Sequence, residues 1–496
     1  MNKKLLLAID IGTTNSKGAL FALDGDVVAS ASRRHAVYNP HEGWAEHDAE
    51  QVWWKELQEI CRELINSDGI SASDILSVGI SSLNPALVPV DGQGKALYPA
   101  MLYGLDRRAV QEVADLTDEL GAYLEEQGEG KITPLSIGPK ILWLKRNEPE
   151  IFQKAAYFIG VPTFLVWRLT GSIVTDIACN TISGVPFSKK RLVWDEIMCR
   201  ACGITADRLP ELRFASECAG VVTEEASACT GLLAGTPVAV GTGDFPAEYL
   251  SYGTNFSKMK KISFGTTSGV NFGNDPSAAL FKNYSPATRR NNVPGGSMSN
   301  GCSTIDWVLS MISGVGAEKH IDNQMRYEMA NNSPAGANGV TILPYLNGEK
   351  NPFLDPGAKG MIFGLRTGHT QADLYKAALE SLSYSIRHMM AVHSPEDIEK
   401  EAVVIGGGTR MPMLLQTVSD VTGYRLIKLK NHYGALAGGA FIAGMAGGVF
   451  SKQEDINSWV KIDETIEPRS ELKEVYDQGY QTYIDLYKVT SDIMHR

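Results

Sequence analysis

The chain has 496 residues, with 46 Lys and Arg against 57 Asp and Glu, so its formal net charge is −11. Hydrophobic residues make up 44% and charged residues 21%, which is typical of folded domains and excludes a disordered or low-complexity chain. At about 100–200 residues per domain, this length predicts two to four domains. The acidic balance argues against nucleic acid or an anionic membrane as partner, although backbone N–H groups can still bind phosphate.

The cysteines and the apolar segments indicate the cellular location of the protein. Seven cysteines are too few for a disulfide framework, so we expect a reducing, cytoplasmic location. Cys199 and Cys202 form the one suggestive pair, and without a second pair at zinc spacing they are interpreted as ordinary thiols. The apolar run Leu5 to Ile9 is too short for a signal peptide. The Gly- and Ala-rich segment Tyr433 to Phe450 predicts a buried helix rather than a membrane span.

The N-terminal 40 residues predict a β-meander. Leu5 to Asp10 is a short apolar run, Lys17 to Leu23 alternates, and Val27 to Val37 follows the hairpin turn Asp24-Gly25. Three antiparallel strands at the start of the chain do not fit the alternating β and α elements of a plain doubly wound domain.

A helix and a further strand follow the meander. Apolar residues recur at helical spacing between Val52 and Leu64, and Asp48 with Gln51 predicts a capping box at its start. Ile75 to Ser81 is then another apolar strand. The layout is therefore mixed α/β.

A second copy of this pattern begins about 250 residues later. Lys261 to Gly265 and Ser268 to Phe272 predict two strands joined at Gly265-Thr266-Thr267, which is similar to Gly12-Thr13-Thr14. Farther along, Glu401 to Ile405 predicts a strand and Met411 to Val421 a helix. The repetition indicates an internal duplication and two α/β lobes.

Three segments are expected from this pattern. The first covers residues 1–250, the second covers residues 251–450, and residues 451–496 form a helical closing segment. The boundary falls between Asp244 and Lys261, where Gly253-Thr254-Asn255 reads as a linker.

The motif at Asp10 to Lys17 carries the most distinctive chemistry. A carboxylate ends a strand, and a tight glycine turn then exposes successive N–H groups and two hydroxyls, an arrangement that can bind an anion. Asp10 is placed to hold Mg²⁺ against phosphates, and Lys17 can add positive charge. The alternative is a glycine hairpin with solvated threonines. The candidate phosphate-binding residues here are Thr13, Thr14, Asn15 and Lys17.

Two further glycine motifs extend this chemistry. Gly265, Thr266 and Thr267 repeat the first turn, so two such turns could hold the two ends of a triphosphate, unless the second is a plain hairpin. The glycines before Thr409, including Gly407 and Gly408, end a strand and open a helix, where adenine and ribose could lie against the backbone. A Rossmann fingerprint and a P-loop are excluded because their spacing is absent.

Asp244 follows a predicted strand, Pro237 to Val240, and precedes a helix that Pro246 could start. An aspartate at that position can be merely a helix cap. Beside two phosphate turns it becomes a candidate to bind the hydroxyl that accepts phosphate.

These stretches together resemble the FGGY carbohydrate kinases, which belong to the actin and hexokinase superfamily. Further segments that resemble the family are Lys140 to Leu144, Trp167 to Gly171, Thr175-Asp176, Tyr345 to Pro352, Gly360 to Leu365 and Asp373-Leu374. The resemblance covers nearly the whole chain. It implies an α/β fold of two RNase H-like (actin-type) lobes, with mixed sheets flanked by helices and an active-site cleft between the lobes.

The resemblance also implies an activity, ATP- and Mg²⁺-dependent phosphorylation of a sugar or polyol hydroxyl. By this likeness Asp244 matches the catalytic aspartate and Asp10 the carboxylate on the magnesium side. The two threonine turns match the phosphate contacts, and Gly407 and Gly408 match the adenosine loop.

The sequence differs from the family pattern at residues that are expected to bind the acceptor. Xylulokinases carry Gly-Gln-Met-His where this chain has Ser82 to Pro85, so only Asn84 keeps a side chain that could bond a sugar there. Asp106 and Arg108 preserve an Asp-x-Arg pattern and could contact hydroxyls, or could be a surface pair.

We therefore expect a kinase acting on a small sugar or polyol, with a ketopentose-like acceptor favoured. Gluconate and glycerol or tetritols are alternative acceptors, and a nucleotide-binding regulator without catalysis is the alternative of another class. No nucleic acid or membrane is expected as partner, and a homodimer is an option that the sequence leaves open.

Overall fold

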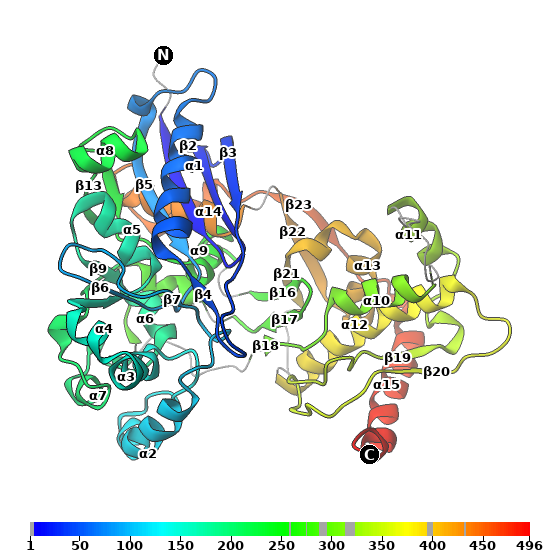
Figure 1. Ribbon diagram of the computed structural model, residues 1–496. Helices are drawn as coiled ribbons and strands as arrows, with labels where there is room; N and C mark the ends of the chain where they lie inside the picture. Colours follow the sequence, from blue (N-terminus) through cyan, green and yellow to red (C-terminus); the bar gives the residue numbers. More distant parts are fainter. Residues whose placement is uncertain are drawn as a thin grey trace. The chain divides into compact units, whose positions relative to one another are not determined.

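The computed structural model describes residues 4–256, 259–273, 275–286, 295–312, 323–393, 400–430 and 433–496. The chain divides into two compact units, each an α/β arrangement with its own mixed sheet (Figure 1). Unit 1 comprises Met1–Ser257, Asp275–Arg289 and His432–Val460. Unit 2 comprises Lys258–Asn274, Arg290–Asn431 and Lys461–Arg496.

The main sheet of unit 1 has the strand order β13-β14-β5-β1-β2-β3, with β15 pairing β5 as well. Strands β1, β2 and β3 form the predicted antiparallel meander, and β1, β14 and β15 all run parallel to β5. These strands are β1 (Leu5–Ile11), β2 (Asn15–Ala22), β3 (Val27–Arg34), β5 (Ile75–Ser82), β13 (Cys218–Val221), β14 (Pro237–Ala239) and β15 (Thr242–Gly243).

Helices and short strand pairs surround this sheet. The helices of unit 1 are α1 (Lys55–Ile65), α2 (Val110–Gln127), α3 (Ile137–Asn147), α4 (Pro149–Lys154), α5 (Val161–Thr170), α6 (Ile177–Ser183), α7 (Glu196–Ala201), α8 (Glu224–Thr230), α9 (Asp244–Ser251) and α14 (Ala435–Ala446). The short pairs are β4 (Glu46–His47) with β7 (Ala100–Met101), β6 (Val88–Val90) with β8 (Tyr157–Ile159), β9 (Val174–Asp176) with β12 (Glu211–Arg213), and β10 (Phe187–Ser188) with β11 (Val193–Trp194).

The helix predicted after the meander is confirmed, with an irregular start. Asp48 accepts hydrogen bonds from the backbone N–H groups of Glu50 and Gln51, and a π-helical turn over Ala49–Trp54 leads into α1. The buried face of α1 consists of Leu57, Ile60, Cys61 and Leu64. Burial of each of the larger aliphatic chains contributes about 1.5–3 kcal/mol, which fixes the helix on β2 and β3.

Helix α14 packs in unit 1 although it comes late in the chain. Figure 1 shows it in orange against the blue strands of unit 1, where it packs on β1, β5 and α9. This differs from the expected segment 251–450, because residues 275–289 and 432–450 pack with unit 1. The approach is close because both surfaces are glycine-rich: a Cβ on Gly79 would lie 2.0 Å from the carbonyl oxygen of Gly439.

The sheet of unit 2 has the order β18-β17-β16-β21-β22-β23. Strands β16 and β17 form an antiparallel hairpin, and β21 runs parallel to β16, as the duplicated pattern predicts. The strands are β16 (Lys260–Phe264), β17 (Ser268–Asn271), β18 (Gly296–Ser297), β21 (Glu401–Ile405), β22 (Arg425–Leu429) and β23 (Ile462–Ile466), with β19 (Thr341–Leu343) and β20 (Met361–Phe363) forming a separate pair.

The helices of unit 2 are α10 (Cys302–Ile312), α11 (Asn323–Asn331), α12 (Gln371–His393), α13 (Pro412–Thr422) and α15 (Lys473–Met494). The expected closing segment 451–496 is divided between the units. Its beginning, up to Val460, belongs to unit 1, whereas β23 and α15 belong to unit 2.

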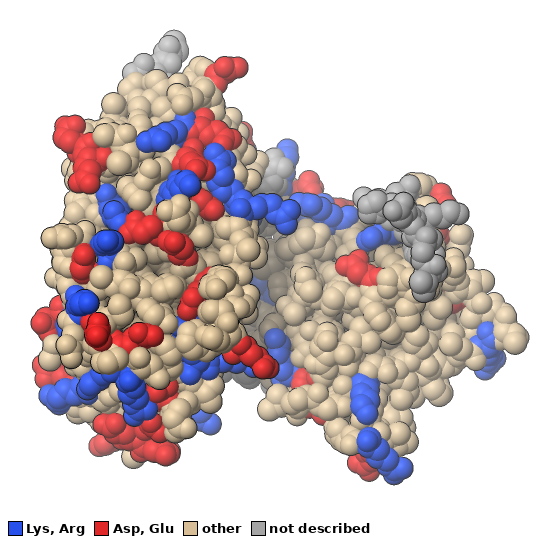
Figure 2. All heavy atoms as spheres, viewed as in Figure 1, with Lys and Arg blue, Asp and Glu red and all other residues tan. Residues whose placement is uncertain are grey.

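The chain's surface and thiols agree with its composition. On the face seen in Figure 2, acidic and basic groups are interspersed over much of unit 1. All seven cysteines are unpaired. Among the described helices, none combines the length and the apolar character that crossing a membrane requires.

The contact between α14 and α9 generates a test of the packing. A Cβ on Gly438 would lie 1.9 Å from the carbonyl oxygen of Ala247, so Gly438→Ala should force the two helices apart and lower the free energy of unfolding by about 1–3 kcal/mol. Gly121→Ala is the matched control. Its Cβ meets nothing within 4 Å on α2, so it should stabilise by about 1 kcal/mol. Chemical denaturation of both variants checks this, and equal stability of the two would contradict the close packing.

Candidate active site

Two carboxylates meet at one edge of the unit 1 sheet. Asp10 lies near the end of β1 and pairs in register with Ser81 of β5, and Thr242 of β15 pairs with the same Ser81 on its other side. Asp244 follows β15 directly and is the N-terminal residue of α9. Because the three strands are parallel, their carboxyl ends lie at one edge, so the fold brings Asp10 and Asp244 together.

Both carboxyl groups have raised pKa values. Burial, and then the nearby charge of Asp10, raise the pKa of Asp244 to about 7. Burial also raises the pKa of Asp10, against the opposing effects of the Ser81 hydroxyl, which donates a 2.8 Å hydrogen bond, and of Lys17. An ordinary aspartate is a weak base, and these surroundings make Asp244 a stronger one near neutral pH.

A third carboxylate at this edge was not foreseen from the sequence. Glu248 lies one helical turn after Asp244 on α9 and accepts a 2.7 Å hydrogen bond from the Tyr252 hydroxyl. Burial raises the pKa of Glu248, Asp10 adds to the effect, and Tyr252 and Lys17 oppose it. The only sequence signal was its spacing of four residues from Asp244, which places both on one helical face.

The turn between β1 and β2 lies next to Asp10. Lys17 pairs in register with Asp10 across the hairpin, and Thr14 is exposed at the turn. The hydroxyl of Thr13 lies 3.0 Å from that of Tyr103, a contact that the sequence gave no reason to expect. Asn15 begins β2 and Lys17 is its third residue, so the four predicted phosphate-binding residues of this motif lie within the turn and the first residues of β2.

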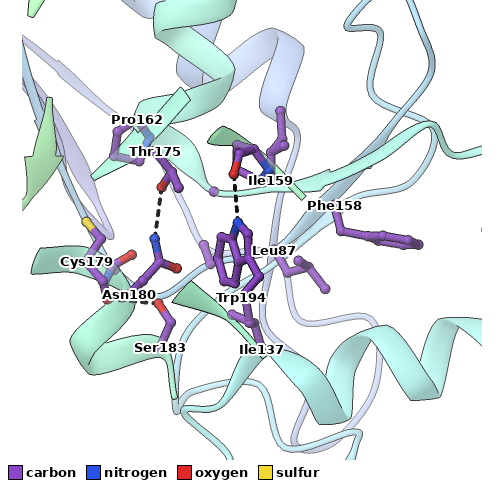
Figure 3. A pocket seen from close by; sticks show the side chains of 14 residues that line it. Leu87, Ile137, Phe158, Ile159, Pro162, Thr175, Cys179, Asn180, Ser183 and Trp194 are labelled. Atoms are coloured by element: carbon purple, nitrogen blue, oxygen red, sulfur yellow. Dashed lines mark hydrogen bonds between the residues drawn. The ribbon is translucent and has the colours of Figure 1, made fainter. Parts of the chain in front are cut away.

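Asn84 also lies beside the carboxylate strand. Its side-chain amide donates a 3.1 Å hydrogen bond to the carbonyl of Cys179, and its Cβ lies 3.0 Å from where a Cβ on Gly243 would be. Behind Asn84 is a small cavity of about 20 Å³, whose lining includes Thr175 and Asn180 (Figure 3). That volume has room for about one water molecule and is too small for a sugar.

Asp106 and Arg108 are neither a surface pair nor exposed to a ligand. Both side chains are fully buried, and the Arg108 guanidinium bonds to Asp106 and, at 2.7 Å, to Glu46. It also stacks on Trp44, 3.7 Å from the ring centre. Asp106 accepts a further bond from the backbone N–H of Ala45. Intraprotein partners therefore occupy these groups, and the expectation that they contact acceptor hydroxyls finds no support in the structure.

The second threonine turn is in unit 2, between β16 and β17. Gly265, Thr266 and Thr267 are all exposed there. The start of α10 holds the turn, because the N–H of Cys302 donates to the Gly265 carbonyl at 2.9 Å and the Ser303 hydroxyl donates to the Thr266 carbonyl at 2.8 Å.

The glycine loop follows β21 and opens into a short 3₁₀ turn, Gly407–Arg410, before α13. Gly407 has open space where a Cβ would be, whereas a Cβ on Gly408 would meet Phe264 at 2.6 Å. Thr409 donates its hydroxyl to the Gly406 carbonyl at 2.8 Å, so that hydroxyl supports the loop.

A pocket of about 350 Å³ adjoins this loop. Its lining consists of Gln324, Arg326, Tyr327, Tyr375, Arg410, Met411, Pro412 and Met413. Its size suits a purine base, and aromatic, arginine and methionine side chains are groups on which a purine packs well. The glycines are recognisable in the sequence but the pocket is not, because α11 and α12 contribute lining residues that are distant from the glycines in the chain.

Asp10 has the chemistry that Mg²⁺ requires. Its carboxylate is desolvated, with the Ser81 hydroxyl on one oxygen, and a divalent cation would compensate its charge. Among the described residues, no cluster of three or more His, Cys, Asp and Glu side chains could hold a metal alone. This fits Mg²⁺, which binds through one or two carboxylates together with phosphate oxygens and water.

Comparison with known proteins places the chain in a family. The N-terminal domain of the FGGY family of carbohydrate kinases matches residues 5–250, and the C-terminal domain of the same family matches residues 260–447. The chain therefore belongs to the FGGY family of carbohydrate kinases, enzymes that use ATP to phosphorylate an alcohol group.

Individual relatives are named for different acceptors. The chain is 26% identical to a xylulose kinase of Bacillus subtilis (strain 168), over 99% of this chain and 98% of that protein. It is 29% identical to a glycerol kinase of Citrifermentans bemidjiense, over 97% of this chain and 98% of that protein. The crystal structure of xylulose kinase from Rhodospirillum rubrum superposes with a TM-score of 0.82 at 28% identity, over 99% of this chain and 100% of that one.

The raised pKa of Asp244 predicts a pH-dependent effect on stability. At pH values between 3.8, the ordinary pKa of aspartate, and about 7, the pKa of Asp244 in the folded state, this carboxyl group binds more protons in the folded than in the unfolded state. The contribution of Asp244 to the free energy of unfolding therefore falls as the pH rises through this range. Asp244→Asn removes the charge and should stabilise the protein more at about pH 8 than at about pH 5, with a difference of about 2–3 kcal/mol.

Denaturant unfolding at the two pH values measures this difference. Asp68→Asn, at an exposed aspartate away from the site, is the control and should show no comparable change. If Asp244→Asn gave the same stability change at both pH values, the desolvation of Asp244 would be refuted.

Proposed function

We propose that this kinase transfers the γ-phosphate of ATP to a hydroxyl of a small sugar or polyol held beside Asp244, with a ketopentose-like acceptor favoured. The observation that carries the proposal is the pairing of Asp10 and Asp244 at one sheet edge, where burial raises the pKa of both carboxyl groups. A regulator that only binds nucleotide would gain nothing from such a destabilising pair.

Asp244 is proposed to orient the acceptor hydroxyl and to take its proton. The acceptor oxygen bonds to the γ-phosphorus as the bond to the bridging oxygen of ADP breaks, and the proton passes to the Asp244 carboxylate late in this step. The pKa of about 7 favours this transfer near neutral pH, and such general-base help contributes about 10²–10⁴-fold in rate. When bound at Asp10, Mg²⁺ would neutralise charge on the phosphates.

The nucleotide contacts are proposed in both units. Thr13, Thr14, Asn15 and Lys17 of unit 1 and the turn Gly265 to Thr267 of unit 2 would bind phosphates through N–H and hydroxyl groups, as exposed turns of this kind bind anions. The unit 2 pocket lined by Arg410 to Met413, which directly follow Gly407 to Thr409 in the chain, would hold the adenosine, since its volume of about 350 Å³ suits adenine.

The acceptor class rests on the segment Ser82 to Pro85. Leu83 is buried and Pro85 has no polar side-chain atom, so Asn84 is the side chain of this segment proposed to bond the acceptor. A site that offers other hydrogen-bonding groups than a xylulokinase should reject D-xylulose strongly. Other pentuloses or polyols are therefore favoured, and gluconate and glycerol or tetritols are the alternatives that a panel of acceptors distinguishes.

Replacing Asp244 tests the proposed chemistry. With the best acceptor from a panel of pentuloses, hexuloses, polyols and sugar acids, Asp244→Asn should lower acceptor-dependent ADP release by about 10²–10⁴-fold, because the hydroxyl loses its base. ATP binding, measured by calorimetry, should change by less than about 3-fold, since the nucleotide contacts remain. Turnover comparable to that of the wild type and of the Asp68→Asn control would overturn the role of Asp244.

The proposed adenosine loop, which precedes the pocket residues in the chain, is tested at Gly407. Gly407→Val adds a side chain into open space, so the fold should be unaffected while ATP affinity falls by roughly 10-fold or more through loss of room for the ligand. Gly368→Val is the control, because Gly368 is an exposed glycine of unit 2 with equally free space. Calorimetric titration with ATP measures both, and an unchanged affinity in Gly407→Val would contradict the assignment.

A further inference from the structure

The turn between β1 and β2 has all three of its carbonyl groups bonded within the protein. The Nε2 atom of His35 lies 3.2 Å from the Gly12 carbonyl oxygen, and Nε2 of His47 lies 3.1 Å from that of Thr13. The backbone N–H of His35 donates to the Thr14 carbonyl at 3.1 Å. The two histidine rings contact each other, with centres 4.9 Å apart, so they form one cluster next to the turn.

The proton position on His47 is fixed by its neighbours. The indole N–H of Trp53 donates to Nδ1 of His47 at 3.2 Å, and an indole can only donate. Nδ1 therefore has no proton, and Nε2 carries the one that bonds to Thr13. Burial, followed by the nearby His35, lowers the pKa of His47 to about 4, so the ring stays neutral.

His35 is held in a similar way by a carboxylate. Its Nδ1 lies 3.0 Å from Oε2 of Glu56, and both side chains are largely buried. One proton lies between Nδ1 and Glu56, whichever of the two atoms carries it. Nε2 faces a carbonyl oxygen, which can only accept, so it keeps its own proton and donates to Gly12.

This arrangement sets the direction of the turn's N–H groups. The peptide bonds of the turn are trans and planar, so the carbonyl of one residue and the N–H of the next point in opposite directions. Holding the carbonyls of Gly12 and Thr13 toward the histidines therefore directs the N–H groups of Thr13 and Thr14 away from them. A flipped peptide would instead present an oxygen on that side and repel an anion.

We infer that His35 and His47 are positioning residues for phosphoryl transfer, which hold the Gly12 and Thr13 carbonyls so that the N–H groups of Thr13 and Thr14 face the nucleotide phosphates. The inference rests on the proposed function, in which this turn binds phosphate. The turn of unit 2 supports it independently, since its carbonyls at Gly265 and Thr266 are also held by donors, supplied there by the start of α10.

Two substitutions at His47 test the inference. His47→Leu removes the donor, whereas the amide nitrogen of Gln in His47→Gln can take the place of Nε2. We expect His47→Leu to weaken ATP and ADP binding by roughly 10-fold, as loss of preorganised N–H donors should. Adenosine binding should stay within about 2-fold, because adenosine lacks the phosphates. His47→Gln should recover most of the loss, and the KM for ATP should follow the same order while the KM for the acceptor changes little.

Calorimetry with ATP, ADP and adenosine on the full-length protein gives these affinities. His35→Leu and His35→Gln repeat the test for the Gly12 carbonyl, and they replace the His47 variants if His47→Leu does not fold. The control is His41→Gln, because His41 is an exposed histidine. Equal loss for adenosine and ATP, or no loss in the Leu variants, would overturn the inference. If the wild type itself bound ATP no more tightly than adenosine, phosphate binding and the proposed function would fail with it.

Discussion

The candidate site of unit 1 depends on one constraint, the placement of Asp10 and Asp244 at the same carboxyl edge of a buried sheet. Strand β5 lies between β1 and β15, so the parallel register leaves no other place for the two carboxylates. Burial raises the pKa of both, and the charge of Asp10 further disfavours the charged form of Asp244. A folded protein retains such a pair at the expense of stability, and in the proposed function a cation at Asp10 and an acceptor hydroxyl at Asp244 would account for its presence.

The residues around Asp10 and Asp244 hold the elements of the candidate site in place. Glycines 438 and 79 let α14 approach α9 and β5 closely, so the helix that carries Asp244 is packed against rigid neighbours. The turn beside Asp10 has its carbonyls bonded to His35 and His47, and the turn of unit 2 has its own bonded to α10. In both turns the backbone carbonyl groups are oriented by partners within the protein, so the proposed binding of phosphate would require little rearrangement there.

Much of this could be predicted from local sequence. Hydrophobic periodicity and turn residues located β1, β2, β5, β16, β21 and α13 to within a few residues, and the two threonine turns and Asp244 stood out as motifs. Long-range packing could not be read in the same way. It buries Asp106 and Arg108 among aromatic rings, places α14 with unit 1, and raises the pKa of Asp244 through neighbours distant in sequence. Tyr103 and the two histidines likewise join the candidate site only when separate segments come together in the fold, whereas Glu248 follows Asp244 by four residues on α9.

The central claim, that Asp10 and Asp244 form one site for a metal, phosphate and acceptor, is tested most directly by crystallography with Mn²⁺ and a non-hydrolysable ATP analogue. The account predicts an anomalous Mn²⁺ peak bound to Asp10 directly or through one water, within about 2–5 Å of its carboxylate, with nucleotide phosphate oxygens among its other ligands. A peak and phosphates remote from both Asp10 and Asp244 would contradict it.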